Sequence, residues 1–328
     1  MKHLFVINPR SFPVQAALDK IFKEIKDCFT DLEGEEFSIL ISRYPRNAIS
    51  LIRKKMKEFR SGEKVRVYAV GGDGILYDCL NGIIGLPNME LAAVPYGMAN
   101  DFIRAFGEDK KATFRNIRLQ VISPAIATDI IHCGDNYALN FCTVGMESDA
   151  IRTSLNIYDQ LPRDFRKFHN INYFVYITLF YFGGVVAAFN KKVQRQYYKI
   201  NIDGEDFSGN YATINIANGP CYGGNMHPVI TAMPNDGVFD VLFFKHKSVL
   251  RTASLITKFT RGEFRRYPED FILKRLRRIE IQSEDPLLVD LDGEVFFDTS
   301  LLIEVMPQAV MVVAPGGIEF KTFADLYE

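Results

Sequence analysis

Two loops that combine glycines with a carboxylate follow apolar segments in the first third of the chain: Gly71–Gly74 (GGDG) and Pro95–Asp101 (PYGMAND). Glycine lets backbone N–H groups approach an anion closely, and a strand that passes through glycines into a helix forms a phosphate-binding loop. A carboxylate such as Asp73 or Asp101 is favourable beside phosphate when Mg²⁺ lies between the two. The alternative is a tight turn in which each aspartate caps the helix that follows. Neither loop is a Walker A or GxGxxG sequence, so those two classes of phosphate site are not indicated.

A third group of carboxylates lies far downstream, where the segment VDLDGEVF contains Asp290, Asp292 and Glu294. Side chains alternate along a strand, so three residues spaced by two are expected on one face. We interpret them as carboxylates of a second domain that closes over the first and supplies a base or a metal ligand. The alternative is an ordinary Asp-Gly hairpin turn at Asp292.

The first 125 residues alternate apolar runs with segments of helical spacing. Strands are expected at 3–8, 36–42, 64–70 and 90–97, and helices at 14–30, 48–59 and directly after the GGDG loop. This alternation predicts a doubly wound parallel sheet, an α/β fold in which ligands bind at the carboxyl ends of the strands. Both glycine loops fall at such ends, as does Asn8-Pro9-Arg10-Ser11.

The pattern changes after residue 125 to short apolar runs separated by Gly, Asp and Asn turns, which is typical of an antiparallel β-sandwich. Helical segments at 151–191 and near 247–262 interrupt it. The chain is therefore predicted to form an α/β domain over residues 1–125 and a β-sandwich domain over 126–305. Two further strands are expected from residue 300 onward, and the tail at about 306–328 is expected to pack back on the first domain.

Composition limits the classes of function. The formal net charge of −1 gives no general attraction to nucleic acid, so an anionic ligand must be held by local groups. The five cysteines form no CxxC pair, which indicates buried reduced thiols in a cytoplasmic protein. The apolar run 173–189 contains Gly183-Gly184 and is short for a membrane span, so a buried or interfacial helix is predicted.

Six segments, taken in order along the chain, carry a family resemblance: INPRS (7–11), GGDG (71–74), VPYGMANDF (94–102), ANGPCYGG (217–224), NDGVFDV (235–241) and DGE (292–294). They resemble the diacylglycerol kinase catalytic-domain family, which includes bacterial soluble lipid kinases and sphingosine kinases. GGDG by itself is shared with NAD kinases, whereas the later combination is more specific to the lipid kinases. The resemblance implies that the α/β domain binds ATP and the β-sandwich holds the lipid.

The resemblance also implies roles for individual residues. The positions on the nucleotide side are Asn8, Ser42, Gly71, Gly72, Asp73, Gly74, Ile75, Met98, Asn100 and Asp101. Asp73 would act in catalysis and would hold the catalytic Mg²⁺ together with Asp101. Asp292 and Glu294 match the acidic pair that activates the lipid hydroxyl. Asp236, with the carbonyl groups of Met233 and Val238, matches the ligands of a structural Mg²⁺; an Asp-Gly loop turn is the alternative there.

Five residues depart from the family pattern at the presumed nucleotide site. Ile75 and Met98 stand where hydroxyl residues are usual, Tyr77 and Asp78 replace an Asn-Glu pair, and Phe12 replaces a glycine. Losing a hydroxyl donor to a charged phosphate costs about 1.5–3 kcal/mol, which weakens ATP binding without forbidding it.

Three functions therefore stay open: an ATP- and Mg²⁺-dependent lipid kinase, a non-catalytic relative that binds lipid or nucleotide, and, less favoured, an NAD-kinase-like enzyme. The lipid kinase would work in the cytoplasm or at the inner face of the membrane, with peripheral contact at most and no nucleic-acid partner. The acceptor lipid and the oligomeric state, including a dimer, are left open. The basic runs 163–169 and 258–266 would contact headgroups or form solvated helix faces, and His227 is expected in a loop.

Overall fold

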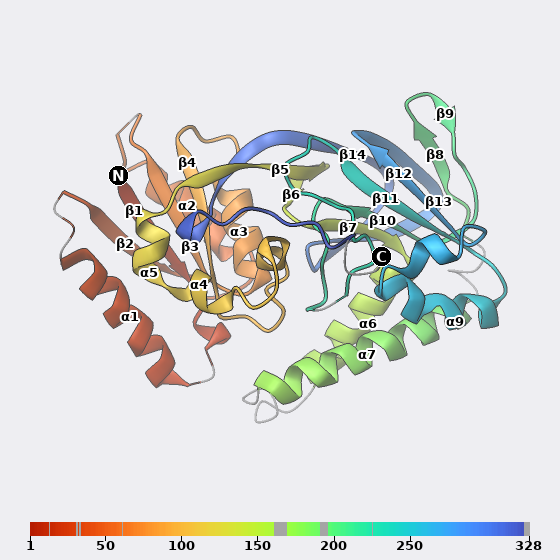
Figure 1. Ribbon diagram of the computed structural model, residues 1–328, viewed down its shortest axis with the longest axis horizontal. Helices are drawn as coiled ribbons and strands as arrows, with labels where there is room; N and C mark the ends of the chain where they lie inside the picture. Colours follow the sequence, from red (N-terminus) through yellow and green to blue (C-terminus); the bar gives the residue numbers. More distant parts are fainter. Residues whose placement is uncertain are drawn as a thin grey trace. The chain divides into compact units, whose positions relative to one another are not determined.

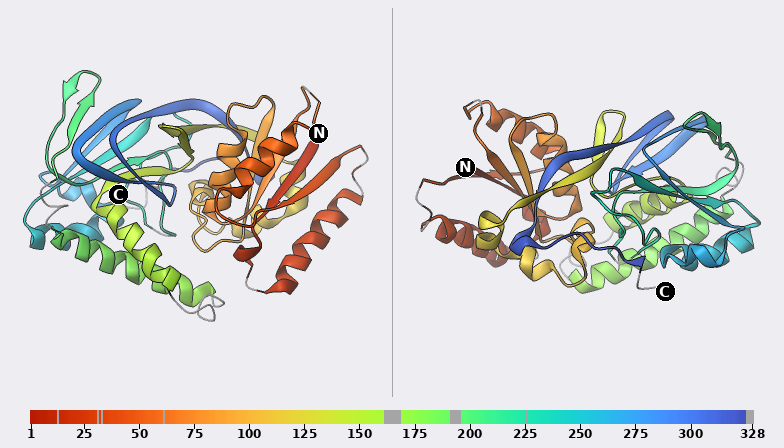
Figure 2. Two further views of the ribbon diagram at one scale, coloured as in Figure 1. Left: turned by 180° about the vertical axis from the view of Figure 1, so that it is seen from behind. Right: turned by 45° about the horizontal axis from the view of Figure 1, so that its top comes forward.

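The computed structural model describes residues 1–324 except for 13, 31, 33, 61, 161–168, 191–195 and 225. The chain forms two compact units (Figures 1 and 2). The first comprises Met1–Thr128 with Gln308–Lys321, and the second comprises Asp129–Pro307 with Thr322–Glu328. The chain leaves the first unit at residue 128, where the sequence predicted a boundary at 125. The C-terminal tail is shared between the two units: residues 308–321 belong to the first unit, and the residues after them belong to the second.

The first unit contains a parallel sheet with helices on both faces, as predicted. Its strands are β1 (Lys2–Ile7), β2 (Glu36–Ile41), β3 (Val65–Gly71) and β4 (Met89–Pro95), in the order β4-β3-β1-β2. The end of β14 (Glu294–Val313) adds a parallel edge beside β4 through Met311 and Val312. The helices are α1 (Gln15–Thr30), α2 (Asn47–Met56), α3 (Asp73–Ile83), α4 (Lys111–Arg115) and α5 (Ile117–Ile122), with 3₁₀ turns η1 (Pro9–Ser11), η2 (Phe102–Phe106) and η5 (Pro315–Gly317).

Alternation along the strands divides the apolar side chains of this sheet between two layers. Phe5, Ile7, Tyr68 and Val70 form one core with α1 and α5. The residues between them, such as Val6 and Ala69, are equally buried and face the layer of α2 and α3. In α1 the buried positions are Leu18, Ile21, Ile25 and Cys28, which follow the spacing of three and four residues expected of a helix that covers a sheet.

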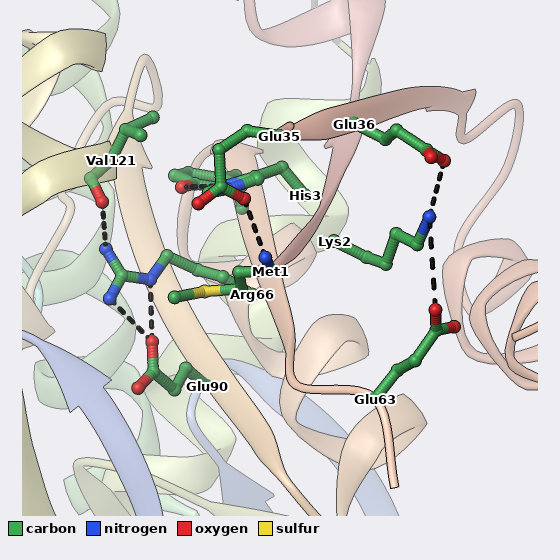
Figure 3. A network of polar contacts seen from close by, with 10 residues as sticks. Met1, Lys2, His3, Glu35, Glu36, Glu63, Arg66, Glu90 and Val121 are labelled. Atoms are coloured by element: carbon green, nitrogen blue, oxygen red, sulfur yellow. Dashed lines mark hydrogen bonds and ion pairs between the residues drawn. The ribbon is translucent and has the colours of Figure 1, made fainter. Parts of the chain in front are cut away.

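Charged groups anchor the amino ends of these strands (Figure 3). The guanidinium of Arg66 donates from Nε to Glu90 (2.7 Å) and from Nη1 to the carbonyl of Val121 (2.8 Å). His3 bonds the Tyr68 hydroxyl through Nδ1 (2.7 Å) and lies 3.1 Å from the carboxylate of Glu35 through Nε2. The buried cation thus satisfies a carbonyl at the carboxyl end of α5, and the network fixes the edge of the sheet opposite the glycine loops.

The second unit is built on antiparallel strands, in agreement with the predicted β-sandwich. The ladder β12-β11-β10-β7-β13-β14 consists of β12 (Phe271–Leu276), β11 (Phe239–Lys245), β10 (Tyr211–Ala217), β7 (Phe141–Gly145), β13 (Arg278–Leu291) and β14. Further strands are β5 (Ala125–Cys133), β6 (Asn136–Ala138), β8 (Lys199–Ile202) and β9 (Glu205–Asp206). The expectation of two strands after residue 300 is wrong, because β14 runs without a break to Val313.

Three helices cover one face of this ladder: α6 (Met146–Gln160), α7 (His169–Phe189) and α9 (Val249–Thr260), with the 3₁₀ turn η4 (Glu263–Arg266) (Figures 1 and 2). Phe244, Phe259 and Phe271 pack together where α9 meets the sheet. All five cysteines are free and buried, as predicted. Within the described part of the chain, no helix has the length and apolarity needed to cross a membrane.

Candidate functional site

Four loops meet at the carboxyl edge of the parallel sheet in the first unit. The strands end at Ile7, Ile41, Gly71 and Pro95 and pair in parallel, so the segments after them emerge on the same side. Backbone hydrogen bonds link neighbouring loops: the Tyr96 N–H donates to the Gly71 carbonyl over 2.7 Å. The two glycine loops therefore lie side by side at the edge where ligands bind in such sheets.

The two loops touch at Gly72 and Gly97. A Cβ atom added to Gly97 would lie 2.2 Å from the Cα of Gly72, and one added to Gly72 would lie 3.0 Å from the Cα of Gly97. Backbone occupies this space on both sides, so Gly97 in particular cannot carry a side chain without a shift of the loops. Gly72 is also the N-cap of α3, an 11-residue helix whose first N–H groups have no acceptor within the helix.

Asp73 clamps the second loop to the start of α3. Its Oδ2 accepts the backbone N–H of Asn100 (2.8 Å), and its Oδ1 accepts that of Asp101 (2.7 Å). Asn100 holds a left-handed conformation with φ +54° and closes its own loop, since its amide bonds both the N–H and the carbonyl of Gly97. Burial raises the pKa of Asp73, and the backbone N–H bonds oppose that rise.

Most residues that depart from the family pattern point into the core. Ile75 and Tyr77 are 3% and 2% exposed, and Phe12 is buried with its ring 4.6 Å from that of Tyr96. Met98 is partly exposed in the second loop. Three of these departures are therefore core side chains, and one of them, Ile75, packs against the GGDG loop, since a Cβ atom on Gly71 would lie 2.7 Å from its Cγ2.

Arg46 explains why Tyr77 and Asp78 occur together. Its guanidinium carbon lies 4.1 Å from the centre of the Tyr77 ring, and Nη1 lies 3.6 Å from the carboxylate of the buried Asp78. Burial raises the pKa of Asp78, and the charge of Arg46 opposes this. Arg46 itself holds φ +66°, a conformation that favours glycine. Sequence reasoning missed Arg46 because only the structure brings the loop after β2 next to α3.

Asn8 and Ser42 lie at this edge, and their side chains form hydrogen bonds within their own turns. The Asn8 side chain accepts the N–H of Arg10 (3.1 Å) at the start of η1, and the Ser42 hydroxyl donates to the carbonyl of Tyr44 (3.4 Å). Their places at strand ends agree with the expected nucleotide side, and no contact in the structure tests that role.

Lys111, which sequence reasoning also missed, brings a cation to the second loop. Its Nζ lies 3.5 Å from the carbonyl of Met98. Burial lowers the pKa of Lys111, as do the charges of Arg104 and Arg115, while Asp73 and Asp101 raise it. A single lysine after a variable loop carries no recognisable sequence signal, so only the fold could reveal it.

In the second unit, Asp292 is a clamp as well. It begins the two-residue Asp-Gly turn between β13 and β14, with φ +51° at Asp292 and +89° at Gly293. Its carboxylate accepts three backbone N–H groups, those of Leu139 (2.7 Å), Asn140 (3.1 Å) and Phe141 (2.8 Å). These bonds fix the turn against the start of β7. The carboxylate that follows, on Glu294, is partly exposed.

The prediction that Asp290, Asp292 and Glu294 share one face is wrong. The chain reverses at the turn, so Asp290 pairs with Val295 while Glu294 pairs with Leu291. Paired residues lie on the same face of an antiparallel ladder, which puts Asp290 and Glu294 on opposite faces. Asp290 is fully buried and caps the turn by accepting the Gly293 N–H (2.7 Å). Burial raises its pKa well above the ordinary value.

A second buried carboxyl lies on the same side of the ladder. Glu147, at the start of α6, accepts a hydrogen bond from the Asn215 amide (3.1 Å), and burial raises its pKa to about 8. The second oxygen of Glu147, the amide oxygen of Asn215 and one oxygen of Asp290 have no hydrogen-bond partner. Carboxyl groups in such surroundings favour the protonated form.

The residues expected to hold a structural Mg²⁺ are not open to one. Asp236 accepts the Val238 N–H on Oδ1 (3.2 Å) and pairs with Arg275 through Oδ2, while the Met233 carbonyl accepts the Asn235 N–H (2.9 Å). Arg275 also donates from Nε to the buried Asp240 (3.1 Å). The guanidinium thus supplies the positive charge of this turn, and the side chains do not fit an ion there.

Asp73 and Asp101 meet the smaller need of a Mg²⁺ that is held mainly by phosphate and water. No three His, Cys, Asp or Glu side chains gather as a metal site in the part of the chain that the structure describes. Mg²⁺ that acts on nucleotides commonly takes one or two carboxylates and completes its shell with phosphate and water. The bond from the Asp101 N–H to Asp73 places these two aspartates next to each other in the loops.

The remaining candidates have ordinary partners. His227 is buried, with Nδ1 2.9 Å from the thiol of Cys221, so it is a core histidine of the second unit. Lys258 and Arg266, from the basic run 258–266, both pair with Glu263. The other basic run, 163–169, lies outside the described residues apart from its last position.

Comparisons with known proteins agree with this architecture. Residues 2–130 match the diacylglycerol kinase catalytic domain, and residues 166–314 match the YegS C-terminal NAD kinase beta sandwich-like domain. A protein of Staphylococcus aureus (strain Mu3), provisionally named a lipid kinase, is 25% identical over 314 residues, which cover 95% of this chain and 93% of that protein. A protein of Staphylococcus epidermidis with the same provisional name is 24% identical over 281 residues, covering 85% and 86%.

Solved structures share the fold at lower identity. A diacylglycerol kinase from Bacillus anthracis superposes with a TM-score of 0.67 at 18% identity, covering 97% of this chain and 98% of the other. A second protein from that organism, provisionally named a diacylglycerol kinase, gives a TM-score of 0.71 at 20% identity and covers 97% and 96%. Both domain matches follow the same order as the motifs in the sequence. The chain therefore belongs to the diacylglycerol kinase catalytic-domain family, in the form that joins this domain to a YegS-type β-sandwich.

Proposed function

We propose that this protein is a lipid kinase that transfers the γ-phosphate of ATP to a lipid hydroxyl with the help of Mg²⁺. The observation that carries the proposal is the contact of Gly72 with Gly97, at which the two loops meet backbone to backbone at the start of α3. Asp73 locks the loops in this arrangement. N–H groups at a helix start suit a phosphate, and rigid placement is what phosphoryl transfer needs most.

Each group of the first unit has a role in this proposal. The first-turn N–H groups of α3 would bind phosphate oxygens, and Lys111 would add an ammonium group beside the second loop. Asp73 and Asp101 would hold Mg²⁺, which neutralises charge on the phosphates when it is bound. Because both oxygens of Asp73 accept N–H groups, Asp101 would be the more available ligand and Asp73 the residue that positions it.

In the second unit, Glu294 would accept the proton of the lipid hydroxyl. The hydroxyl oxygen would form a bond to the γ-phosphorus as the bond to the bridging oxygen breaks, and ADP would leave. Asp292, with three N–H partners, would be a positioning residue that fixes the turn preceding Glu294. The acceptor would be a diacylglycerol-like lipid at a membrane surface, which the protein would meet as a peripheral partner in the cytoplasm.

The second candidate is a non-catalytic relative that binds lipid or nucleotide. Ile75 and Met98 favour it, because neither offers a hydroxyl to a phosphate. The burial of Tyr77 favours the kinase, because this side chain points into the core. Nucleotide binding separates the two candidates.

The test is calorimetric titration of ATP, GTP and CTP with Mg²⁺, followed by transfer assays on lipids in mixed micelles. Wild type is expected to bind ATP in the micromolar range, and Asp73→Ala to bind at least tenfold more weakly. Glu294→Gln should bind ATP as wild type does. Its kcat should fall at least about 100-fold, which is a typical rate contribution of a general base. Binding of ATP without transfer to diacylglycerol, a sphingoid base, phosphatidylglycerol or undecaprenol would favour the non-catalytic candidate, and so would failure to bind any nucleotide.

A further inference from the structure

One face of α7 packs closely inside the second unit. A Cβ atom on Gly183 would lie 3.0 Å from the Ala150 carbonyl oxygen of α6, and one on Gly184 would lie 3.6 Å from Ile256 of α9. Ala187 is buried, and the hydroxyl of Tyr181 bonds that of Thr260 (2.9 Å). The glycine pair thus lets the neighbouring helices approach the backbone of α7 and defines its inner face.

The opposite face of α7 is apolar and exposed. Phe182 and Phe189 are each 58% exposed, Val185 is 42% exposed and Val186 is 47% exposed. Their spacing of three, four and seven residues places them within an arc of about 100° on the helix. We call these four residues the α7 stripe. Large side chains of this kind at four adjacent surface positions indicate an interaction surface, because single exposed apolar residues are ordinary but a contiguous group is not.

A cationic residue accompanies the α7 stripe. The contacts of Gly184 with Ile256 and of Tyr181 with Thr260 show that α9 runs antiparallel to α7. Arg261 is exposed and follows Thr260 directly, so it lies at the Phe182 end of the stripe. At the other end of α9, Leu250 is 77% exposed and precedes Arg251, in the direction of Phe189. Arg251 pairs with the buried Asp270 (2.6 Å), so Arg261 is the cation that we assign to the stripe, and Leu250 adds one more exposed apolar side chain.

We propose that the α7 stripe docks on the surface of a lipid bilayer that contains anionic lipids. Apolar side chains on one face of a helix that lies in the interface enter the boundary between headgroups and acyl chains, and nearby Lys and Arg bind anionic headgroups. The inference rests on the proposed function, which requires an acceptor that resides in a membrane. It assigns the surface through which the second unit reaches that acceptor.

A second copy of this chain is a poorer occupant. In a symmetric dimer the same patch meets itself, so Arg261 would face a like charge. The stripe is also only about 10 Å long at 1.5 Å per residue, far short of the roughly 800 Å² per partner that a stable interface buries. A bilayer needs neither a large flat area nor self-complementary charge.

The chain contains no tryptophan, which allows a direct test. Phe189→Trp places a single indole on the stripe, and Phe297→Trp places one at another exposed phenylalanine of the second unit, 60% exposed on β14. With vesicles of phosphatidylcholine and phosphatidylglycerol at 7:3, emission of Phe189→Trp should shift to the blue and be quenched by lipids brominated on the acyl chains. Emission of Phe297→Trp should change in neither way. Equal responses of the two variants would overturn the proposal.

Sedimentation with sucrose-loaded vesicles measures the strength of binding. The double variant Phe182→Ser/Phe189→Ser should bind at least about tenfold more weakly than wild type, since it loses two apolar side chains that enter the interface. The matched variant Phe297→Ser should bind as wild type does, and circular dichroism should show equal melting for all three. Unchanged binding of the double variant would overturn the proposal, as would a wild-type dimer that the double variant abolishes without any vesicle binding.

Activity separates this inference from the proposed function. The double variant should phosphorylate lipid in mixed micelles at the wild-type rate and lose at least about tenfold on lipid in vesicles. If wild type binds vesicles through the stripe but phosphorylates no lipid in either form, the proposed function fails and the docking surface stands. If wild type is active on vesicles and the double variant is equally active, the docking surface fails and the proposed function stands.

Discussion

Asp73 in the first unit and Asp292 in the second sit in similar sequences, GGDG and DGE, and both bind backbone N–H groups. Asp73 accepts two, from the neighbouring loop of a parallel sheet, and Lys111 lies close to that loop. Asp292 accepts three, from the start of β7, and holds a hairpin turn. The difference lies in what each carboxylate holds: Asp73 fixes the neighbouring loop of a parallel sheet, and Asp292 fixes its own hairpin turn against three consecutive residues that lead into β7.

This comparison assigns the chemistry to the neighbours of the two clamps. A carboxylate that orders a loop cannot easily leave its N–H partners during a reaction, because buried N–H groups without acceptors are costly. Asp101 follows the first clamped loop, and Glu294 follows the second clamped turn. In both units the conspicuous aspartate of the motif fixes the backbone, and under the proposed function the acidic residue after it would carry out the chemistry.

Removing the two clamps should have unequal effects on stability, and this is the largest effect expected. Asp292→Ala leaves three backbone N–H groups without their acceptor and should lower the free energy of unfolding by about 4 kcal/mol. Asp73→Ala, which loses two bonds, should cost less. Urea unfolding followed by circular dichroism measures both.

Glu294→Ala is the control for Asp292→Ala, since it changes a partly exposed side chain two residues away. It should alter the free energy of unfolding by less than about 0.5 kcal/mol, as surface substitutions do. Equal stability of the Asp292 and Glu294 variants would contradict the division into clamp and neighbour.

Two buried groups, one in each unit, should also respond to pH in opposite directions. Burial lowers the pKa of His3 below 6.5, so its contribution to stability is complete above pH 6.5 and is lost as the pH falls below that value. Burial raises the pKa of Glu147 from 4.5 to about 8, so its contribution is complete below pH 4.5 and is lost as the pH rises toward 8.

The free energy of unfolding measured at pH 5, 6.5 and 8 checks both signs. Glu147→Gln should stabilise the protein relative to wild type at pH 8, by on the order of 3 kcal/mol more than at pH 5. His3→Gln should instead flatten the loss of stability between pH 6.5 and 5. A Glu147→Gln variant whose advantage does not grow with pH would show that Glu147 is ionised in the folded protein.

A methyl group at the loop contact should separate binding from folding. Gly97→Ala puts a Cβ atom 2.2 Å from the Cα of Gly72, so the loops must part; we expect a loss of about 2 kcal/mol in stability. ATP affinity should fall at least tenfold, because the first-turn N–H groups of α3 would no longer be aligned. Met98→Ala, which changes the next side chain without adding one at the contact, is the control in both measurements.

The smallest effect concerns the dependence on metal. Because Arg275 supplies the positive charge at Asp236 and Asp240, melting of the wild type should be equal in Mg²⁺ and in EDTA. Arg275→Met should lower stability by about 1 kcal/mol, a modest value because the arginine is more than half exposed. A rise in the melting temperature with Mg²⁺ that the Asp236→Asn variant abolishes would show that an ion occupies this turn in place of the guanidinium.

Much of the fold could be predicted because its signals are local. Alternating apolar runs and helical spacing indicated the parallel sheet, and Gly-rich turns indicated the antiparallel unit. The course of β14 could not be predicted, because one strand pairs with β13 along part of its length and with β4 near its end, and pairing with distant segments leaves no local signal. The side on which Asp290 lies was missed because an Asp-Gly turn reverses the chain within the motif.

Parts of the candidate site depend on contacts between distant segments. The loops Gly71–Gly74 and Pro95–Asp101 were recognisable, because glycines and carboxylates at strand ends are typical of sites that bind phosphate and Mg²⁺. The partners of Tyr77, Asp78 and Met98 were not, since Arg46 and Lys111 reach them only in the folded unit. Hydrogen bonds such as those of Asp292 to residues 139–141 join positions about 150 residues apart, and the sequence of neither segment indicates them.

The division of the chain has a consequence for folding during synthesis. The edge of the first sheet is completed by Met311 and Val312, which pair with Glu90 and Leu91 of β4, more than 200 residues earlier. The first unit therefore cannot finish its sheet while the ribosome is still making the second. At 5–20 residues per second, β4 waits on the order of 10 seconds or more with an open edge. The delay makes β4 a preferred contact point for chaperones and for aggregation.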